Sequence, residues 1–514
     1  MDKINAAEKD APKQQSNARN AATLMGGTLG SRVTGFLRQS LITQLFDKTV
    51  TDALFVALRV PNLFRELLAE GALSNSFIPV YRTFKGAEAK RLSAALMGLL
   101  ILVNGILLLL AYAGAPYIVD LLLPSQGSVD RDLTLQLTRI VFPFLFAISL
   151  SAWAMGILNA EERFFWPAWA PVALNVVSIV VMLLYPYRAE ALAWGFVLGG
   201  VAQFAVQLPA LLRGGYLHGL RLWHPGLSAV LLLMVPSVFT TSGRQVLNLV
   251  SANVLNLLPE GSVTAFTNAD LFVSLALGLF SVSPALAYYS RLSAQAVDAP
   301  DAFNDTLVEG LRFIGFLTVP AGLLLVVLAQ DVVEIVFNWF PLLGRAGTDP
   351  FTLASTVLAV LPLGLAIFPI GVNNLLVRTF YVRKRVRVPI VLTLVTLTVQ
   401  GTLYYLLYEP LGIEGLSWAT VVASWLQLVG LLVLVAQAEH FGAGRFVRHS
   451  LRVWLAAGVA ALGTSLSLSA LPVATAWTAY TLHAVVGTFV FVVLYASLSV
   501  ALRLPEVARF TRRR

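Results

Sequence analysis

The chain is 514 residues long, and 57% of its residues are hydrophobic while only 12% are charged. Ordinary soluble domains carry about 25% charged residues, so this composition excludes a globular protein with a water-covered surface. The formal net charge is +9, and the chain contains no cysteine, which excludes disulfides, thiolate metal sites and cysteine nucleophiles. The five histidines are scattered without metal-ligand spacing, so we expect no metal site.

Residues 1–20 are polar and mixed in charge, which predicts a disordered cytoplasmic tail and does not match a signal peptide. Apolar segments then recur along nearly the whole chain. A hydrocarbon core about 30 Å thick needs about 20 apolar residues per helix, and about fourteen segments meet that requirement. The expected spans are 23–45, 53–81, 92–122, 133–157, 165–186, 192–212, 226–257, 263–289, 309–330, 351–380, 389–408, 413–437, 453–471 and 475–501. The sequence therefore predicts an all-α polytopic membrane protein.

Two halves of the chain share short patterns in the same order. Residues 143–148 (Pro-Phe-Leu-Phe-Ala-Ile) are similar to 362–367 (Pro-Leu-Gly-Leu-Ala-Ile), and 190–203 are similar to 414–427. Six expected helices separate the copies, and because six is an even number both halves enter the membrane in the same sense, as parallel repeats do. The alternative is chance similarity among leucine-rich helices.

The repeat divides the chain into two expected lobes of six helices each. The N-lobe covers 21–213 and the C-lobe covers 225–440, and two such lobes can rock about a central cavity. The last two helices, at 447–503, lie outside the repeat, and residues 504–514 form a basic cytoplasmic tail.

Lysine and arginine collect in alternate loops, on the side that carries both termini. The exceptions on the other side are Lys48, Arg131, Arg188 and Arg345. By the positive-inside rule both termini are predicted to be cytoplasmic. This asymmetry accounts for the net positive charge without a nucleic-acid partner, because no basic cluster is interleaved with aromatic residues on a soluble surface.

The first two expected helices contain four arginines where apolar residues are expected, namely Arg32, Arg38, Arg59 and Arg65. An arginine near mid-bilayer costs about 2.5–3.5 kcal/mol if it faces lipid, so these side chains must face a wet cavity or one another. A guanidinium group offers paired donors that match phosphate oxygens. Arg244, in the seventh expected helix, joins this set of candidate anion ligands.

The spacing of these arginines leaves two interpretations open. Six residues turn an ideal helix by about 240°, so the members of each pair would not share a face. A local break at Gly35 in the first helix and at Pro61 in the second would bring them together. The alternative is structural, with the arginines of the second helix paired to Glu66 or Glu70, which share one polar stripe with Asn62.

Several runs of residues carry a recognisable pattern. In the first two helices these are Ser31–Arg38, Thr51–Arg65 and Ala69–Ser74. The pattern resembles the MurJ (MviN) family of lipid II flippases. Residues Leu158–Asn175 are similar to that family's turn between helices 4 and 5, and the resemblance extends from about residue 24 to 435.

This resemblance implies the multidrug/oligosaccharidyl-lipid/polysaccharide exporter fold, in which two six-helix lobes enclose a cationic cavity. It also implies that the last two helices form a groove for a polyprenyl tail. By position, the family's essential cavity arginines map onto Arg32, Arg38 and Arg65, and its acidic residue between helices 1 and 2 maps onto Asp52. The basic position before the proline maps onto Arg59. The predicted substrate-binding set is completed by Asn62, Glu70 and Arg244.

The sequence departs from the family pattern at two places. Gln39 stands where the family usually has an aspartate directly after the second arginine. In the eighth helix, Asp270 is followed by Leu271 where the family usually has arginine, and Ser274 replaces a later acidic residue. We hypothesise that Arg244 supplies the lost positive charge. The loss of this arginine favours an alternative, in which the chain is a membrane scaffold that does not transport.

The resemblance implies a role in cell-wall synthesis and cell shape: translocation of an undecaprenyl-pyrophosphate-linked peptidoglycan precursor to the outer leaflet by alternating access. No phosphate-binding loop, serine triad or metal-ligand pattern is present in the sequence, so we expect a transporter and not an enzyme. We expect no cofactor, with the membrane potential or a monovalent cation as the driving force. The expected partners are the anionic lipid-linked substrate and the bilayer. A flippase for another polyprenyl-linked glycan is the nearest alternative.

Overall fold

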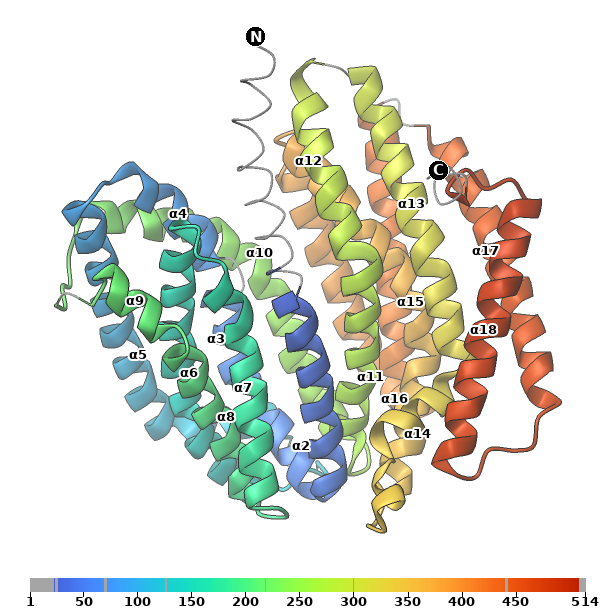
Figure 1. Ribbon diagram of the computed structural model, residues 1–514, viewed down its shortest axis with the longest axis horizontal. Helices are drawn as coiled ribbons and strands as arrows, with labels where there is room; N and C mark the ends of the chain where they lie inside the picture. The colour runs from blue at the N-terminus through green and yellow to red at the C-terminus, as the bar shows by residue number, and fades with distance from the viewer. Residues whose placement is uncertain are drawn as a thin grey trace, which may run out of the picture. The chain divides into compact units, whose positions relative to one another are not determined.

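The computed structural model describes residues 23, 26–68, 72–124, 127–217, 219–298, 300–439 and 442–507. Within these ranges every regular element is helical, which confirms the predicted all-α fold (Figure 1). The chain separates into two compact units, Met1–Leu249 (unit 1) and Val250–Arg514 (unit 2), and the boundary falls inside one long helix. The predicted lobe limits at 213 and 225 remain a prediction.

Unit 1 begins with a helix over residues 26–45, called the first helix below. The later helices of unit 1 are α2 (Lys48–Ala57), α3 (Arg59–Leu68), α4 (Ala72–Thr83), α5 (Ala87–Leu122), α6 (Arg131–Ala160), α7 (Phe165–Leu184), α8 (Ala189–Ala205), α9 (Leu208–Gly214) and the first part of α10 (Pro225–Asn256). The helix expected at 53–81 is thus divided at Leu58. Pro61 explains this position, because a proline ring clashes with the carbonyl four residues earlier, here that of Ala57.

Unit 2 continues α10 and contains longer helices. They are α11 (Ser262–Leu277), α12 (Ser283–Asp298), α13 (Pro300–Val327), α14 (Ala329–Phe337), α15 (Pro350–Val382), α16 (Arg387–Glu439), α17 (Ala443–Ser469) and α18 (Trp477–Ala501). The helix α16 contains a break at Gly412, whose φ of 56° and ψ of −134° favour glycine. This break separates the two spans expected at 389–408 and 413–437.

Ten helices in the described part are long and apolar enough to cross a membrane, by length and composition. Their outward faces are apolar as well. On α5, for example, Leu109 and Leu121 are each 74% exposed. Such faces suit a lipid environment, and the chain is a multi-pass membrane protein. The count of fourteen spans stays a prediction.

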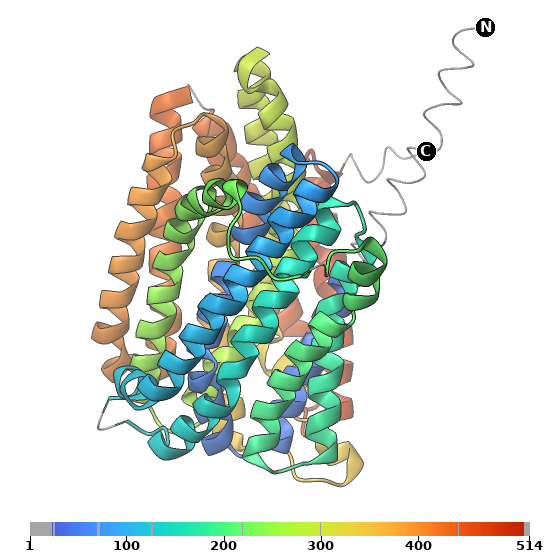
Figure 2. The ribbon, with the colours of Figure 1, turned by 90° about the vertical axis from the view of Figure 1, so that its left-hand side faces the viewer.

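Each unit is built around one central helix. In unit 1, α6 contacts α2, α3, α4, α5 and α8, and α5 lies beside it in both ribbon views (Figures 1 and 2). In unit 2, α15 contacts α11, α12, α13, α14 and α16. These two helices are the most buried of the ten candidate spans, at 72% and 67% of their apolar windows. They contain Pro143 and Pro362, so the two copies of the repeated motif occupy the central helix of their respective units.

The core of unit 1 shows how these helices are held together. Trp153 of α6 is fully buried, and its Nε1 donates a hydrogen bond to the carbonyl oxygen of Ser93 in α5 at 3.0 Å. Phe77 of α4 and Leu92 of α5 pack into the same cluster. Because lipid tails are as apolar as leucine, such contacts stabilise the bundle by close packing and hydrogen bonds more than by removal of apolar surface from water.

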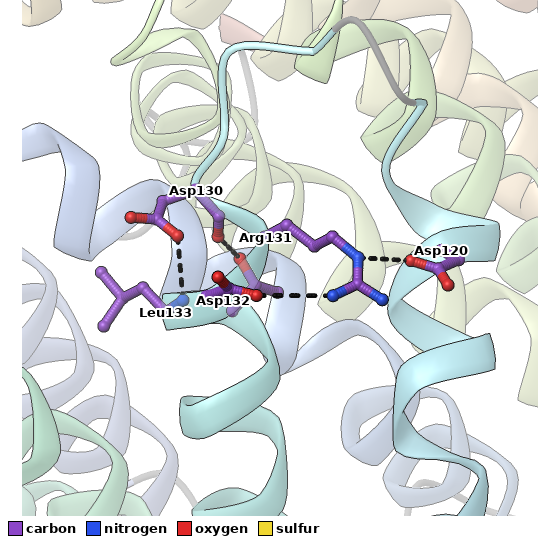
Figure 3. A network of polar contacts seen from close by, with 6 residues as sticks. Asp120, Asp130, Arg131, Asp132 and Leu133 are labelled. Atoms are coloured by element: carbon purple, nitrogen blue, oxygen red, sulfur yellow. Dashed lines mark hydrogen bonds and ion pairs between the residues drawn. The ribbon is translucent and has the colours of Figure 1, made fainter.

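A polar network closes the turn between α5 and α6 (Figure 3). Arg131 donates from Nε to Asp120 Oδ1 at 2.6 Å and from Nη1 to Asp132 Oδ1 at 3.4 Å. Asp130 caps α6, since its Oδ1 accepts a hydrogen bond from the backbone N–H of Leu133 at 2.9 Å. An aspartate cap satisfies a backbone donor that the helix itself leaves unpaired, which explains why α6 begins at Arg131.

Candidate functional site

Arg38, on the first helix, lies inside unit 1 against two other helices. Its Nη1 donates a hydrogen bond to Oδ1 of Asn175 in α7 at 2.8 Å. Its guanidinium carbon lies 4.7 Å from the ring centroid of Phe196 in α8, which is a cation–π contact. The side chain is half-buried. The structure therefore holds this arginine by an amide and an aromatic ring from two different helices.

The charge of Arg38 is not balanced by a carboxylate among the described residues. Its Nε is buried and has no hydrogen-bond partner. The nearby charge that acts on it comes from Arg65 in α3 and has the same sign. A half-buried guanidinium beside a second one is costly unless an anion or water meets it, because a charge loses hydration energy on burial. This arrangement suits a ligand with more than one negative charge.

The other predicted ligands in the first three helices have different surroundings. Arg32, Arg59, Arg65 and Asn62 are half-buried, whereas Asp52 is fully buried in α2. A side chain with no exposed surface cannot contact a large substrate in this conformation. The structure thus leaves the arginines and Asn62 accessible and encloses the predicted acidic residue.

The expected helix breaks have different outcomes. Residues 26–45 form one uninterrupted helix, so the break expected at Gly35 is wrong. A single glycine costs a helix only about 1 kcal/mol, which is too little to interrupt it here. The break expected near Pro61 occurs, three residues earlier at Leu58. Arg59 consequently starts a new helix, α3, which also contains Arg65.

Glu66 is held by an amide of α10. Gln245, which is 3% exposed, donates a hydrogen bond from Nε2 to Glu66 Oε2, and its Oε1 accepts one from Asn248 at 3.4 Å. Glu70 lies outside the described residues, and so does the side chain of Arg244. The expected pairing of arginine with Glu70 and the compensating role of Arg244 therefore stay predictions.

Sequence reasoning did not assign Asn175, Phe196 or Gln245 to the site. Asn175 and Gln245 carry a detectable signal, because a polar side chain in an apolar membrane helix is a candidate functional residue. Phe196 carries no such signal, since α8 is mostly apolar and an aromatic residue there is ordinary.

The structure also shows the surroundings of the residues at which the sequence departs from the family pattern. Gln39 is buried with 7% of its side chain exposed, so no carboxylate stands beside Arg38 at that position. Asp270 is exposed on α11, and Ser274 donates a hydrogen bond to its Oδ2 at 3.5 Å. Leu271 is half-buried. Within the described ranges, no three His, Asp or Glu side chains are grouped as metal ligands.

Comparison with protein families gives one match, to the family described as lipid II flippase MurJ, over residues 41–493. A probable lipid II flippase MurJ from Bdellovibrio bacteriovorus is 33% identical over 512 residues, which is 96% of this chain and 96% of that protein. The lipid II flippase MurJ of Burkholderia cenocepacia is 33% identical over 79% of this chain and 81% of its own length.

Solved structures share the fold. A lipid II flippase MurJ in an inward closed conformation aligns with a TM-score of 0.78 and 21% identity, covering 93% of this chain and 99% of that one. An inward-facing multidrug resistance transporter of the MATE family aligns with a TM-score of 0.61 and 17% identity, covering 84% of this chain and 94% of that one. At these identities the similarity concerns the arrangement of helices alone.

Proposed function

Because the chain belongs to the MurJ family of lipid II flippases, we propose that it moves lipid II from the inner to the outer leaflet of the bacterial cytoplasmic membrane. It is a transporter and not an enzyme. Lipid II is an undecaprenyl-pyrophosphate-linked peptidoglycan precursor, so its headgroup carries a diphosphate. The observation that carries the proposal is Arg38, a guanidinium inside unit 1 whose described contacts are an amide, an aromatic ring and the like charge of Arg65.

In this proposal the arginines bind the diphosphate and the rest of the lobe orients them. Arg38 and Arg65 donate to phosphate oxygens, where the planar guanidinium matches two oxygens at once. Arg32, Arg59 and Asn62 add donors from the first helix and α3. Alternating access then exposes the headgroup on the opposite side, while the polyprenyl tail stays in lipid along the last two helices, α17 and α18.

We place both termini in the cytoplasm, on the basis of the lysine and arginine distribution. With that orientation an inside-negative membrane potential assists export of an anionic headgroup, by about 2.3 kcal/mol per charge per 100 mV. The potential, alone or with a monovalent cation, is our candidate driving force.

One observation favours a second function. Leu271 follows Asp270 in α11, where the resemblance to the family implies an arginine, so a positive charge expected of a transporter in this family is missing there. A protein that had lost transport would still be a membrane scaffold. Export of another polyprenyl-linked glycan is the third candidate, since a diphosphate is common to such lipids.

Complementation of a strain depleted of its own lipid II flippase tests the proposal. We expect the wild-type chain to restore growth and Arg38→Ala to fail, with both proteins present at equal levels in the membrane. Arg503→Ala, an exposed arginine beyond the last helix, is the matched control and should restore growth. Full rescue by Arg38→Ala would overturn the role of Arg38 in transport, whereas failure of the wild-type chain to restore growth would support the scaffold. A flipping assay with purified protein in proteoliposomes containing lipid II then identifies the substrate.

A further inference from the structure

Asn175 is a buried amide that contacts three residues of the first helix. It is 5% exposed. Its Oδ1 accepts the hydrogen bond from Arg38 Nη1 at 2.8 Å, and its Nδ2 donates to the carbonyl oxygen of Ser31 at 3.0 Å and to Oγ1 of Thr34 at 3.0 Å. One side chain of α7 therefore links the backbone of the first helix to the guanidinium group of Arg38.

The partners of this amide allow only one orientation. If the amide were turned over, Nδ2 would face an Arg38 N–H and Oδ1 would face the Ser31 carbonyl oxygen, which places donor against donor and acceptor against acceptor. A guanidinium group always donates and a carbonyl oxygen always accepts. The acceptor of Asn175 is thus fixed on Arg38.

Close packing of the two helices brings this short side chain within reach. A Cβ at Gly35 would lie 3.4 Å from Nδ2 of Asn175, and a Cβ at Gly30 would lie 3.4 Å from Cγ2 of Val172. Both distances are van der Waals contacts, so the first helix lies against α7 at these two glycines. A longer distance between the first helix and α7 would break the hydrogen bond between Asn175 and Arg38.

The contact with Asn175 also decides which edge of the guanidinium is left for a ligand. Asn175 occupies Nη1, and Phe196 covers one face of the planar group. Nε is buried without a partner, and no described residue hydrogen-bonds to Nη2. The edge formed by Nε and Nη2 presents two parallel N–H groups, which is the geometry that binds two oxygens of a phosphate group.

We propose that Asn175 is a positioning residue that holds Arg38 by Nη1 so that the Nε–Nη2 edge binds two oxygens of the substrate's diphosphate. This inference rests on the proposed function, because it assigns one edge of one arginine to the lipid II headgroup. Asn175 does not touch the substrate. It acts by fixing the plane of the guanidinium group before the ligand arrives, which reduces the entropy lost on binding.

A double-mutant cycle separates positioning from helix packing. Lipid II binding is measured on purified full-length protein in detergent for wild type, Asn175→Leu, Arg38→Lys and the double variant. Leucine has a similar size but no hydrogen bonds, and lysine keeps the charge of Arg38 without a planar fork. We expect Asn175→Leu to raise the Kd for lipid II about tenfold with Arg38 present, and less than twofold with Arg38→Lys.

Two measurements control for damage to the fold. The melting temperature of each variant reports its stability, and Asn373→Leu is the matched control, since Asn373 is also 5% exposed and hydrogen-bonds Ser424 and Gln427 within unit 2. Asn373→Leu should leave the Kd unchanged. If Asn175→Leu raises the Kd equally in the protein with Arg38 and in Arg38→Lys, or raises it in neither, the positioning role is wrong. Binding of lipid II by the wild-type protein would still support the proposed function. Failure of the wild-type protein to bind lipid II would instead overturn both.

Discussion

Replacing Gly27 by alanine tests how closely the first helix must lie against α7. The added Cβ would lie 2.5 Å from the carbonyl oxygen of Ala168 and 2.7 Å from its Cβ. Cβ atoms in real structures essentially never come within 3.0 Å of such atoms, so the two helices must separate locally. Gly26 provides a neighbouring control, because among the described residues a Cβ there would meet only Trp169, with Cζ2 at 4.0 Å.

Both substitutions add a methyl group to the helix, but only Gly27→Ala also carries the cost of overpacking against α7. Alanine stabilises a helix interior by about 1 kcal/mol relative to glycine, and Gly26→Ala should gain up to this amount. Overpacking costs about 1–3 kcal/mol, so Gly27→Ala should range from neutral to about 2 kcal/mol destabilising. The stability of the two variants should therefore differ by about 1–3 kcal/mol.

Thermal unfolding of the purified protein in detergent measures this difference. We expect a lower Tm for Gly27→Ala than for Gly26→Ala, together with weaker lipid II binding for Gly27→Ala because Asn175 then reaches Arg38 less well. Equal melting temperatures for the two variants would refute the close approach of the first helix and α7. A lower Tm for Gly27→Ala with unchanged lipid II binding would refute the idea that this close approach positions Arg38.

Three further outcomes are expected. Phe196→Leu removes the ring that covers Arg38, and loss of a cation–π contact of about 0.5–2 kcal/mol should weaken lipid II binding by about two- to thirtyfold, measured as a Kd. Burial alone would raise the pKa of Glu506, but the hydrogen bond and charge of His449 hold it below the ordinary value of 4.5. Ionised Glu506 therefore stabilises the fold above pH 4.5, and this contribution is lost as the pH falls below 4.5 and through the folded-state pKa. The Tm of the wild type, measured against pH, should fall over this range. The Tm of Glu506→Gln should change less. Gly412→Ala places a Cβ at a φ of 56° and ψ of −134° and should cost about 1–3 kcal/mol, seen as a lower Tm, whereas an unchanged Tm would contradict the strain.

The sequence alone determined the fold class and the arginines of the first two helices. A membrane-spanning helix is a local property, because about 20 consecutive apolar residues suffice to define it. Charged residues within such segments are conspicuous for the same reason, which is why Arg38 and Arg65 could be selected without coordinates. The repeated motif at Pro143 and Pro362 was also visible, although its place in the central helix of each unit was not.

Only the tertiary structure decided what surrounds each of these charges. Asn175 and Phe196 are far from Arg38 in the chain, and their contacts with it depend on how α7 and α8 pack against the first helix. The first helix is also continuous through Gly35, where a break was one of the two interpretations of the arginine spacing. A run of about 20 apolar residues specifies that a segment spans the membrane. The partner of a polar side chain is instead set by close packing between helices that lie far apart in the sequence.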